Sequence, residues 1–371
     1  FLLMGQFATH GGLSRALFKF AAVLLGGYRG GLAMAAVGAC AAFGSVCGSS
    51  VATAATIGSV ALPEMRRHGY SGRLATATVA AGGTLGILIP PSVVLVVYAI
   101  LTEQNIAKLF AAAMIPGLIA MVGYMIAIAI YVRVVPGQAP DTESVDTRLS
   151  WALIGGVMPI AIIFVIVFGG IYGGLFTPTE GAAVGAAATF VAALLKREID
   201  WPKFKQCFYS TAEASAMIFL IFLGADLMNA ALALTQVPAQ LAGVVGSWGL
   251  SPLMVVTAIL LFYIVLGAVM DELSMILLTI PIFFPMIMGL DFGMSKEYTA
   301  IWFGIMVLMT VGFGMLAPPV GLNVYVVNGM AKDVPMSESY KGVMPFLISD
   351  TLRTILLLFP SISLFLVKYV S

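Results

Sequence analysis

The chain has 371 residues, of which 61% are hydrophobic and only 9% charged, and its formal net charge is +1. Soluble domains carry about 25% charged residues, so the sequence predicts an integral membrane protein. The near-zero net charge gives no indication of nucleic-acid binding. The long apolar runs do not alternate as barrel strands do, which indicates membrane helices, with room for roughly ten crossings or half-crossings of ~20 residues each.

Two apolar segments near the start are too short to cross a membrane. Residues 31–46 end at the polar segment Gly48-Ser49-Ser50, and residues 51–62 follow it up to a stop at Pro63. Twelve helical residues rise only ~18 Å, about half of a bilayer, so we expect a re-entrant hairpin with the polar segment at its tip. Because Phe1 already lies in apolar sequence, further chain is expected to precede it.

A double proline interrupts the next apolar segment. Residues 74–89 lead through Gly86 to Pro90-Pro91, and residues 92–101 continue beyond them. Proline lacks a backbone N–H and clashes with the preceding helical turn, so the pair predicts a discontinuous helix. Lipid cannot satisfy the backbone groups that the break frees, so they are expected to line a cavity within the protein.

The middle of the chain is predicted to form scaffold and connecting helices. Glycine, proline and charge separate its elements. The expected elements are spans at 107–132, 151–168 and 182–195, a long helix at 208–234 and a charged linker over 134–149. The string Thr177-Pro178-Thr179-Glu180 matches a capping box at a helix start, which needs no substrate.

The first pattern then returns. Residues 252–267 and 273–285 predict a second hairpin whose tip, 268–272, carries Asp271 and Glu272. A second glycine and double proline follow, and the last span is expected at 343–367. Three pairs of prolines support an internal duplication, because their separations nearly agree. These separations are 222 for Pro63 and Pro285, 228 for Pro90 and Pro318, and 229 for Pro116 and Pro345.

Charges beside the two hairpins predict opposite orientations. Residues 66–73 carry three arginines and no acid, whereas residues 289–297 carry two acids and one lysine. Basic loops stay in the cytoplasm, so the first hairpin is expected to open inward and the second outward. The predicted fold class is an all-α polytopic membrane protein with inverted repeats, each holding a re-entrant hairpin and a discontinuous helix. The expected regions are scaffold helices at 1–30, repeat 1 at 31–106, scaffold at 107–250, repeat 2 at 251–332 and a C-terminal scaffold helix at 333–371.

The two hairpin tips hold the candidate ion ligands. Asp271 places a carboxylate in an otherwise apolar run, which is costly at membrane depth unless it pairs or binds an ion. Together with hydroxyls and carbonyls of the first tip, it suits a small hard cation rather than a transition metal. Ser49 and Ser50 could instead bond only to their own helix. Glu272 could snorkel or cap the outgoing half-helix rather than bind an ion.

Several strings resemble the large membrane subunit of TRAP transporters, the tripartite ATP-independent periplasmic carriers. They run over 48–65, 80–92 and 169–180, and the second repeat adds Asp271 and Ala317-Pro318-Pro319. The resemblance implies the ion-transporter-superfamily elevator fold, in the bacterial inner membrane. It also implies sodium-driven import of an organic acid such as a C4-dicarboxylate or sialic acid. The implied partners are a small four-helix membrane subunit, a periplasmic substrate-binding protein and membrane lipid, with Na⁺ as coupling ion and no cofactor.

The resemblance further implies sodium sites near the tips and the broken helices. Ser92 and Asn323 are the polar residues just after each break, and Thr53 lies one turn after Ser49. The candidate sodium ligands are Ser49, Ser50, Gly86, Ser92, Asp271, Gly314, Pro318 and Asn323. The candidate substrate contacts are Ser50, Thr53, Pro90, Pro91 and Asn323.

Two other functions remain open from the sequence. One is a stand-alone ion-coupled carboxylate carrier or antiporter of the same superfamily, and the other is a membrane scaffold that transports nothing. The chain carries no nucleophile–base set, no metalloprotease helix motif and no nucleotide-binding loop. An enzyme is therefore not expected, and any transport is not driven by ATP bound to this chain.

Overall fold

The computed structural model describes residues 1–140, 150–235 and 251–370, and most of them are helical. The helices are α1 (Leu2–His10), α2 (Leu13–Leu25), α3 (Gly31–Cys47), α4 (Ser50–Arg67), α5 (Gly72–Leu88), α6 (Val93–Thr102), α7 (Ile106–Val134), α8 (Trp151–Tyr172), α9 (Pro178–Leu195), α10 (Trp201–Thr235), α12 (Pro252–Gly267), α13 (Glu272–Met288), α14 (Lys296–Gly314), α15 (Leu322–Met330), α16 (Met336–Leu357) and α17 (Pro360–Leu364), followed by a 3₁₀ turn, Val367–Tyr369. Five described helices are long and apolar enough to cross a membrane, or up to seven spans if each bent pair counts as one. The predicted all-α, multi-pass architecture is confirmed.

The first hairpin consists of α3 and α4, as predicted. α3 ends at Gly48, whose φ of +68° lies in the left-handed region that a residue with a Cβ enters only at a cost. Ser49 is extended, and α4 begins directly after it. The two helices therefore reverse direction over two residues, Gly48 and Ser49, at the polar tip.

The first broken helix consists of α5 and α6, which meet at an angle of 41° around the double proline. Each part has its own start. The Oγ of Ser71 accepts a hydrogen bond from the backbone N–H of Leu74, and the Oγ of Ser92 accepts one from that of Leu95. Because α6 begins with its own serine cap, the break is a formed element of the fold rather than a frayed helix.

The second repeat is built from α12 to α15 in the same order. Asp271 caps α13, and Ser295 caps α14 as Ser71 caps α5. The double proline Pro318-Pro319 then separates α14 from α15. Both double prolines contain a cis peptide bond.

Each hairpin crosses its own broken helix at a pair of glycines. A Cβ built on Gly44 would lie 2.5 Å from the Cα of Gly86, and one built on Gly314 would lie 2.7 Å from the Cα of Gly267. Contacts this close are open only to glycine. The crossing therefore occurs at corresponding places in the two repeats, between the incoming hairpin helix and the long part of the broken helix.

A backbone hydrogen bond also ties each tip to the end of each break. The N–H of Val93 donates to the carbonyl of Gly48 at 3.4 Å, and the N–H of Gly321 donates to that of Ala268 at 3.0 Å. These bonds satisfy backbone groups that lipid would leave unpaired. The glycine crossing and this hydrogen bond thus occur in both repeats, as the predicted duplication requires.

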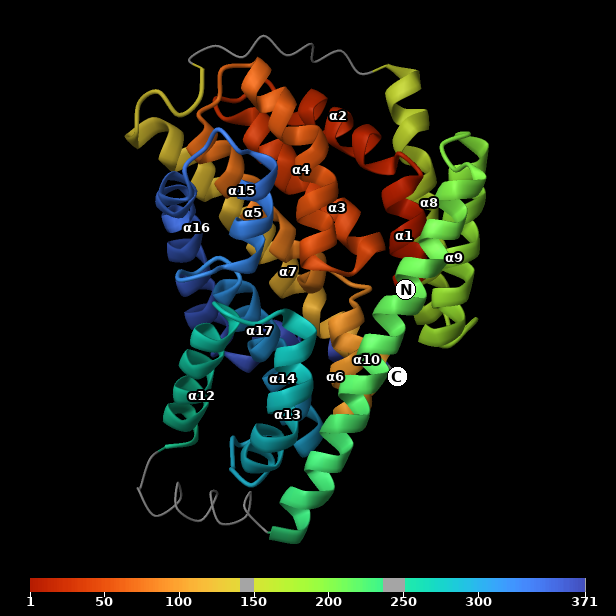
Figure 1. The fold of residues 1–371 in the computed structure, drawn as a ribbon. Coiled ribbons are helices and arrows are strands. Elements are labelled where there is room, and N and C mark those ends of the chain that lie inside the picture. Colours follow the sequence, from red (N-terminus) through yellow and green to blue (C-terminus); the bar gives the residue numbers. More distant parts are fainter. Residues whose placement is uncertain (141–149, 236–250, 371) are drawn as a thin grey trace.

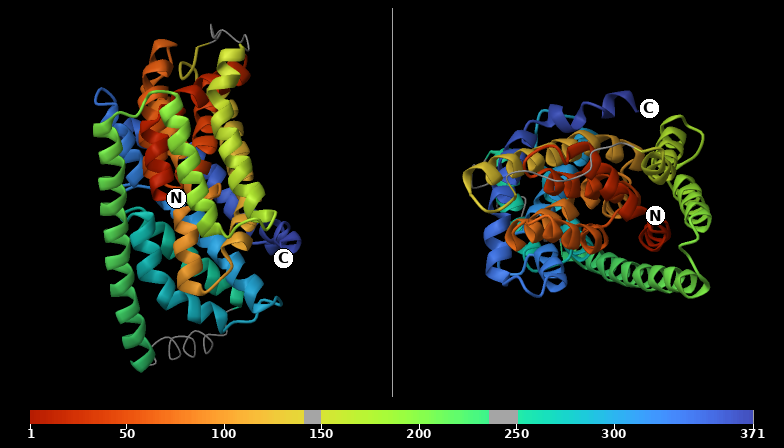
Figure 2. Two further views of the ribbon diagram at one scale, coloured as in Figure 1. Left: turned by 90° about the vertical axis from the view of Figure 1, so that its right-hand side faces the viewer. Right: turned by 90° about the horizontal axis from the view of Figure 1, so that it is seen from above.

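The two hairpins enter the molecule from opposite ends. In Figure 1, α3 and α4 fill the upper part, α12 and α13 the lower part, and the tips approach one another between them. The connection from α4 to α5 and that from α9 to α10 lie at the same end (Figures 1 and 2). Residues 66–73 carry three arginines, and residues 196–205 carry four basic and two acidic residues. The inverted arrangement therefore agrees with the charge pattern, and the cytoplasmic side of this end stays a prediction. The outlying helices α8, α9 and α10 pack along one side (Figure 2).

Several expected helix ends are wrong, and two of them lie at prolines. α4 does not stop at Pro63 but continues to Arg67, because a proline removes one helical N–H while the buried Leu62 and Met65 hold the next turn in place. The last span is not one helix. It bends by 83° where Phe359 adopts an extended conformation before Pro360, as the residue preceding a proline favours.

Candidate functional site

The two hairpin tips meet directly. The Oγ of Ser50, on the first tip, donates a hydrogen bond of 2.9 Å to Oε1 of Glu272, on the second. The backbone N–H of Ser50 points to the same oxygen at 3.4 Å. Ser50 is fully buried and Glu272 is only 4% exposed. A carboxylate therefore lies between the two inverted repeats, at the first residue of α13 and against the first residue of α4.

Three oxygens around this junction are buried without a hydrogen-bond partner among the described residues. They are Oε2 of Glu272, Oγ1 of Thr53 and Oδ1 of Asn323. Buried polar atoms are normally paired, and a carboxylate oxygen left unpaired in a dry site is the most costly of the three. Carboxylate, hydroxyl and amide oxygens are hard ligands, so each of the three is the kind of donor that a small hard cation takes.

Two glycines on α5 bring further oxygens to the same place. A Cβ on Gly86 would lie 2.6 Å from the Ser49 carbonyl oxygen and 2.5 Å from Oγ1 of Thr53. A Cβ on Gly83 would lie 3.0 Å from both the Ser50 carbonyl oxygen and the Asn323 amide nitrogen. The first tip and α15 thus rest on one glycine-lined face of α5, with their oxygens close to its backbone.

Asn323 is held in place from its other end. Its Nδ2 donates to the carbonyl of Ala80 at 3.2 Å, and its backbone N–H donates to the carbonyl of Met315 at 3.2 Å. The amide oxygen is left free by this arrangement. Met315 also reaches the junction, since its sulfur lies 3.4 Å from Oγ of Ser50. The second break therefore contributes to the junction, as well as the two tips.

Asp271 and Glu272 have roles that differ from those expected. Asp271 is half-buried, and its Oδ1 accepts hydrogen bonds from the backbone N–H groups of Leu273 and Ser274, so it is the cap of α13. The expectation that Glu272 could snorkel or cap is wrong, because its side chain points inward to Ser50. At the second tip, Asp271 starts the helix and Glu272 supplies the buried carboxylate.

The remaining candidates lie farther out along the breaks. Ser92 is buried, and its hydroxyl is used to cap α6. Pro91 contacts the first tip through its carbonyl, which lies 3.0 Å from a Cβ built on Gly48, and Pro90 is buried beside it. Pro318 is exposed, so the second break is more open than the first. Gly314 packs on Gly267 instead of joining the junction.

The structure thus gathers Ser49, Ser50, Thr53, Gly86 and Asn323 around one junction. Reasoning from the sequence missed Glu272 as its centre, and with it Gly83 and Met315. A signal was present for Glu272, because the offset of 222 that pairs Ser49 with Asp271 also pairs Ser50 with Glu272. Gly83 carries no such signal, since one glycine in a glycine-rich helix is not distinguished by sequence.

The match to known proteins covers almost the whole chain. The model of the DctM component of tripartite ATP-independent periplasmic transporters matches residues 1–362. The chain belongs to the DctM family. As a DctM chain it is a multi-pass protein of the inner membrane, in agreement with the apolar helices of the described structure.

Curated relatives of this DctM chain carry several substrate names. The C4-dicarboxylate TRAP transporter large permease protein DctM of Pseudomonas aeruginosa is 37% identical over 349 residues, which cover 94% of this chain and 80% of that protein. The isethionate TRAP transporter permease protein DctMQ of Oleidesulfovibrio alaskensis is 31% identical, with 94% and 54% covered. The sialic acid TRAP transporter permease protein SiaT of Haemophilus influenzae is 30% identical, with 98% and 58% covered.

The fold also matches a solved structure. The Alcanivorax borkumensis YdaH transporter, described as having an unusual topology, aligns with a TM-score of 0.63 over 96% of this chain and 84% of its own. The two sequences are only 13% identical, so this likeness concerns the fold alone.

Proposed function

We propose that this DctM chain is the transport subunit of a sodium-coupled importer of organic acids. The observation that carries the proposal is the junction of the hairpin tips, where a buried carboxylate bonds from one tip to the other and two further unpaired oxygens lie on α4 and α15. Polar and ionisable groups within a membrane transporter usually mark the path of an ion or substrate. Sodium is the coupling ion that such hard oxygen ligands fit.

The mechanism follows from the half-helix ends at each tip. α3 and α12 point their carbonyl ends at the tips, which favours a cation, whereas α4 starts there without a side-chain cap, so the amide groups of its first turn favour an anion. Sodium bound by the oxygens of both tips would hold them together and leave amide groups for a substrate carboxylate. In our proposal, the hairpins and broken helices then slide as an elevator together with α7 and α16, which are hydrogen-bonded or ion-paired to α5 and α14. Although the sequence assigned α7 and α16 to the scaffold, we propose that they move with the ion and the acid against the remaining helices.

The substrate we propose is a C4-dicarboxylate or a related organic acid. The relatives described above are named for a C4-dicarboxylate, for isethionate and for sialic acid, all of which are organic anions. The partners we propose are a small four-helix membrane subunit and a periplasmic protein that delivers the substrate. A stand-alone carrier of the same superfamily is the alternative, and it differs by needing no delivered substrate.

The test is uptake of a labelled C4-dicarboxylate by the complete transporter in liposomes. Uptake is expected only with an inward sodium gradient and the periplasmic binding protein present. Glu272→Gln is expected to abolish sodium-driven uptake while the complex still assembles, because glutamine keeps the size of the side chain and removes only the charge at the junction. Asp291→Asn is the matched control, since Asp291 bonds the backbone of an exposed loop after the same hairpin.

Each of these uptake measurements has an outcome that would contradict the proposed sodium-coupled, binding-protein-dependent importer. Uptake that is equal with and without sodium overturns the coupling. Uptake without the binding protein favours the stand-alone carrier. Full sodium-driven uptake by Glu272→Gln rules out the role assigned to that charge.

A further inference from the structure

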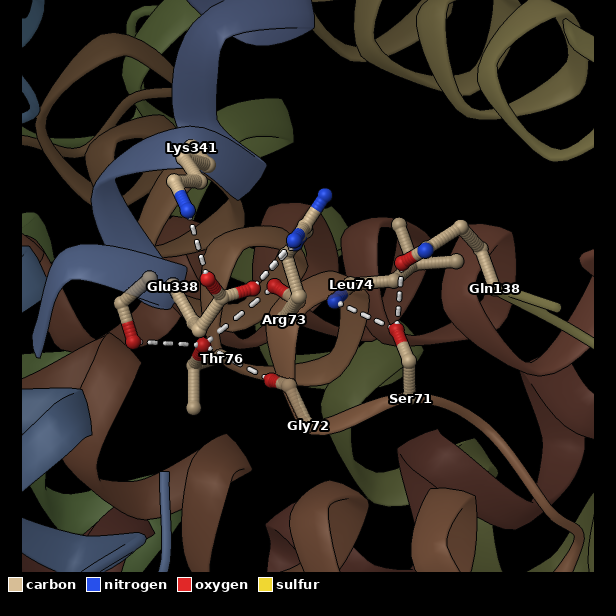
Figure 3. A network of polar contacts seen from close by, with 9 residues as sticks. Ser71, Gly72, Arg73, Leu74, Thr76, Gln138, Glu338 and Lys341 are labelled. Atoms are coloured by element: carbon tan, nitrogen blue, oxygen red, sulfur yellow. Dashed lines mark hydrogen bonds and ion pairs between the residues drawn. The ribbon is translucent and has the colours of Figure 1, made fainter. Parts of the chain in front are cut away.

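An ion pair joins the two repeats at one end of the molecule. Nε of Arg73, at the start of α5, donates a hydrogen bond of 2.7 Å to Oε2 of Glu338, at the start of α16. Lys341 adds a second contact to the same carboxylate at 2.8 Å (Figure 3). Arg73 belongs to repeat 1, whereas α16 follows repeat 2. The pair therefore bridges segments that lie 265 residues apart in the chain.

A second ion pair joins the repeats at the opposite end. Nζ of Lys108, at the start of α7, lies 2.8 Å from Oε1 of Glu297, at the start of α14. α5 and α16 begin at the upper end of the molecule in Figure 1, and α7 and α14 begin at the lower end. One ion pair therefore lies at each end, with the tip junction between them.

The two pairs occupy equivalent positions in the duplicated fold. Arg73 and Glu297 are each the second residue after a capping serine, Ser71 or Ser295, at the start of equivalent helices. Lys108 and Glu338 are each the third residue after the cap of α7 or of α16. The fold thus repeats the contact and exchanges the two charges.

The signs of the charges follow one rule. In the described residues, each ion pair between the repeats takes its base from the first half and its acid from the second, including Arg66 with Asp333. Neither the helix dipole nor the cytoplasmic preference of basic residues explains why the bases lie in the first half. A base in the first turn of a helix opposes the dipole, as both Arg73 and Lys108 do. Lys108 also lies at the end predicted to face outward, where basic residues are not favoured.

Buried contacts support the pair shown in Figure 3. Oγ1 of Thr76 and Oγ of Ser339 are 2.9 Å apart, and Nδ2 of Asn328 donates to the same serine at 3.0 Å. A Cβ on Gly342 would lie 2.5 Å from the carbonyl oxygen of Arg73, so α16 meets α5 backbone to backbone. The ion pair therefore borders a fixed contact between the repeats.

We propose that Arg73–Glu338 and Lys108–Glu297 are paired positioning contacts that hold the two halves of the duplicated fold, α5 with α7 and α14 with α16, in register. They fix the two hairpin tips relative to one another. They therefore also fix the distance between the Ser50 hydroxyl and the Glu272 carboxylate. This proposal rests on the proposed function only for its transport readout. Because the pairs are partly exposed, each contributes modestly, and their effect is on the fit of the ion site.

Charge reversal and charge exchange test the proposal in the reconstituted complex. Lys108→Glu and Glu297→Lys alone are expected to raise the half-saturating sodium concentration about two- to fivefold and to lower the thermal midpoint. The double variant K108E/E297K is expected to restore both. Arg67→Glu is the matched control, since the partner of Arg67 among the described residues is Glu64, on its own helix. A double variant no better than the singles, or a control with the same effect, overturns the proposal.

A covalent link tests whether the contact stays closed during transport. Cysteines replacing Lys108 and Glu297, in a chain whose three native cysteines are replaced, are bridged by a short bismaleimide. Uptake is expected to survive bridging, and its loss on bridging, with single-cysteine variants unaffected, contradicts the fixed register. If no sodium dependence is seen even in the unaltered transporter, the proposed function fails, while rescue of the thermal midpoint by charge exchange still decides on the ion pairs.

Discussion

Single residues decide how closely the first tip can approach α5. Gly86 faces the Ser49 carbonyl and the Thr53 hydroxyl, both within 2.6 Å of where a Cβ would stand. Thr53 has the Cys47 thiol as a neighbour, yet its hydroxyl oxygen makes no hydrogen bond within the described residues. The junction thus depends on a missing side chain as much as on the polar ones.

Replacing Gly86 by alanine is expected to push the first tip away from α5. Overpacking of this kind costs about 1–3 kcal/mol, and here it also displaces oxygens of the proposed ion site. The measurement is the thermal midpoint of the purified protein. Gly155→Ala is the matched control, because nothing lies within 4 Å of a Cβ there, and alanine should stabilise a helix by about 0.5–1 kcal/mol. Equal midpoints for the two variants would contradict the close packing at Gly86.

The acidic residues of the second tip, Asp271 and Glu272, were only partly predictable from the sequence. The offset between the repeats located the tip and its carboxylates, and chemistry indicated an ion there. The sequence favoured Asp271 over Glu272 as the ion ligand, and the structure reverses the two roles. Adjacent residues at a helix start differ by about 100° in direction, so only the packed fold decides which one points inward. The buried partner, Ser50, was already a candidate, whereas its pairing with Glu272 is a long-range contact.

At the scale of elements, a buried polar network joins three helices. Asp350 and Arg353 on α16 form an ion pair of 2.9 Å, as their spacing indicates, and both are nearly inaccessible. The hydroxyl of Tyr124 on α7 donates to Asp350 at 3.0 Å and lies 3.1 Å from that of Thr84 on α5. The helix that carries Gly86 is thus fastened to α7 and α16.

Replacing one partner of this ion pair is expected to lower the stability of the protein more than replacing both partners with apolar residues. Arg353→Met leaves the buried Asp350 carboxylate without its cation and should destabilise the protein by about 3–5 kcal/mol, whereas the double variant D350L/R353M should recover much of the loss. Thermal midpoints measure both. Arg133→Met, at an exposed helix end, is the control and should change little. A double variant less stable than the single one would show that the charges themselves are needed.

Helix existence was predictable along most of the chain, and helix ends were less so. The hairpins, the broken helices and the capping box at Thr177 follow from local chemistry, and the structure has them. Local chemistry does not predict the continuation of α4 past Pro63 or the bend at Phe359. Both depend on neighbouring helices, which decide whether a proline ends a helix or is carried within it.

At the scale of the whole molecule, two inverted halves meet with unlike chemistry. The first break is buried and the second is open, the first tip brings serines and the second a carboxylate, and the bridging bases and acids are divided between the halves. The duplication and its inversion were readable from proline spacing and loop charge. The unlike roles of the halves were not, since they arise only where the repeats touch.

Our central claim is that oxygens from both tips form one sodium site, and sodium-dependent stabilisation tests it most directly. A ligand present at 100 times its dissociation constant stabilises a protein by about 2.7 kcal/mol, so the thermal midpoint should rise in sodium chloride relative to equal potassium chloride. Glu272→Gln keeps the size of the side chain and removes its charge, and it should lose most of this rise. Glu64→Gln, at an exposed site, should keep it. A sodium-dependent rise in Glu272→Gln equal to that of the unaltered protein would contradict the claim.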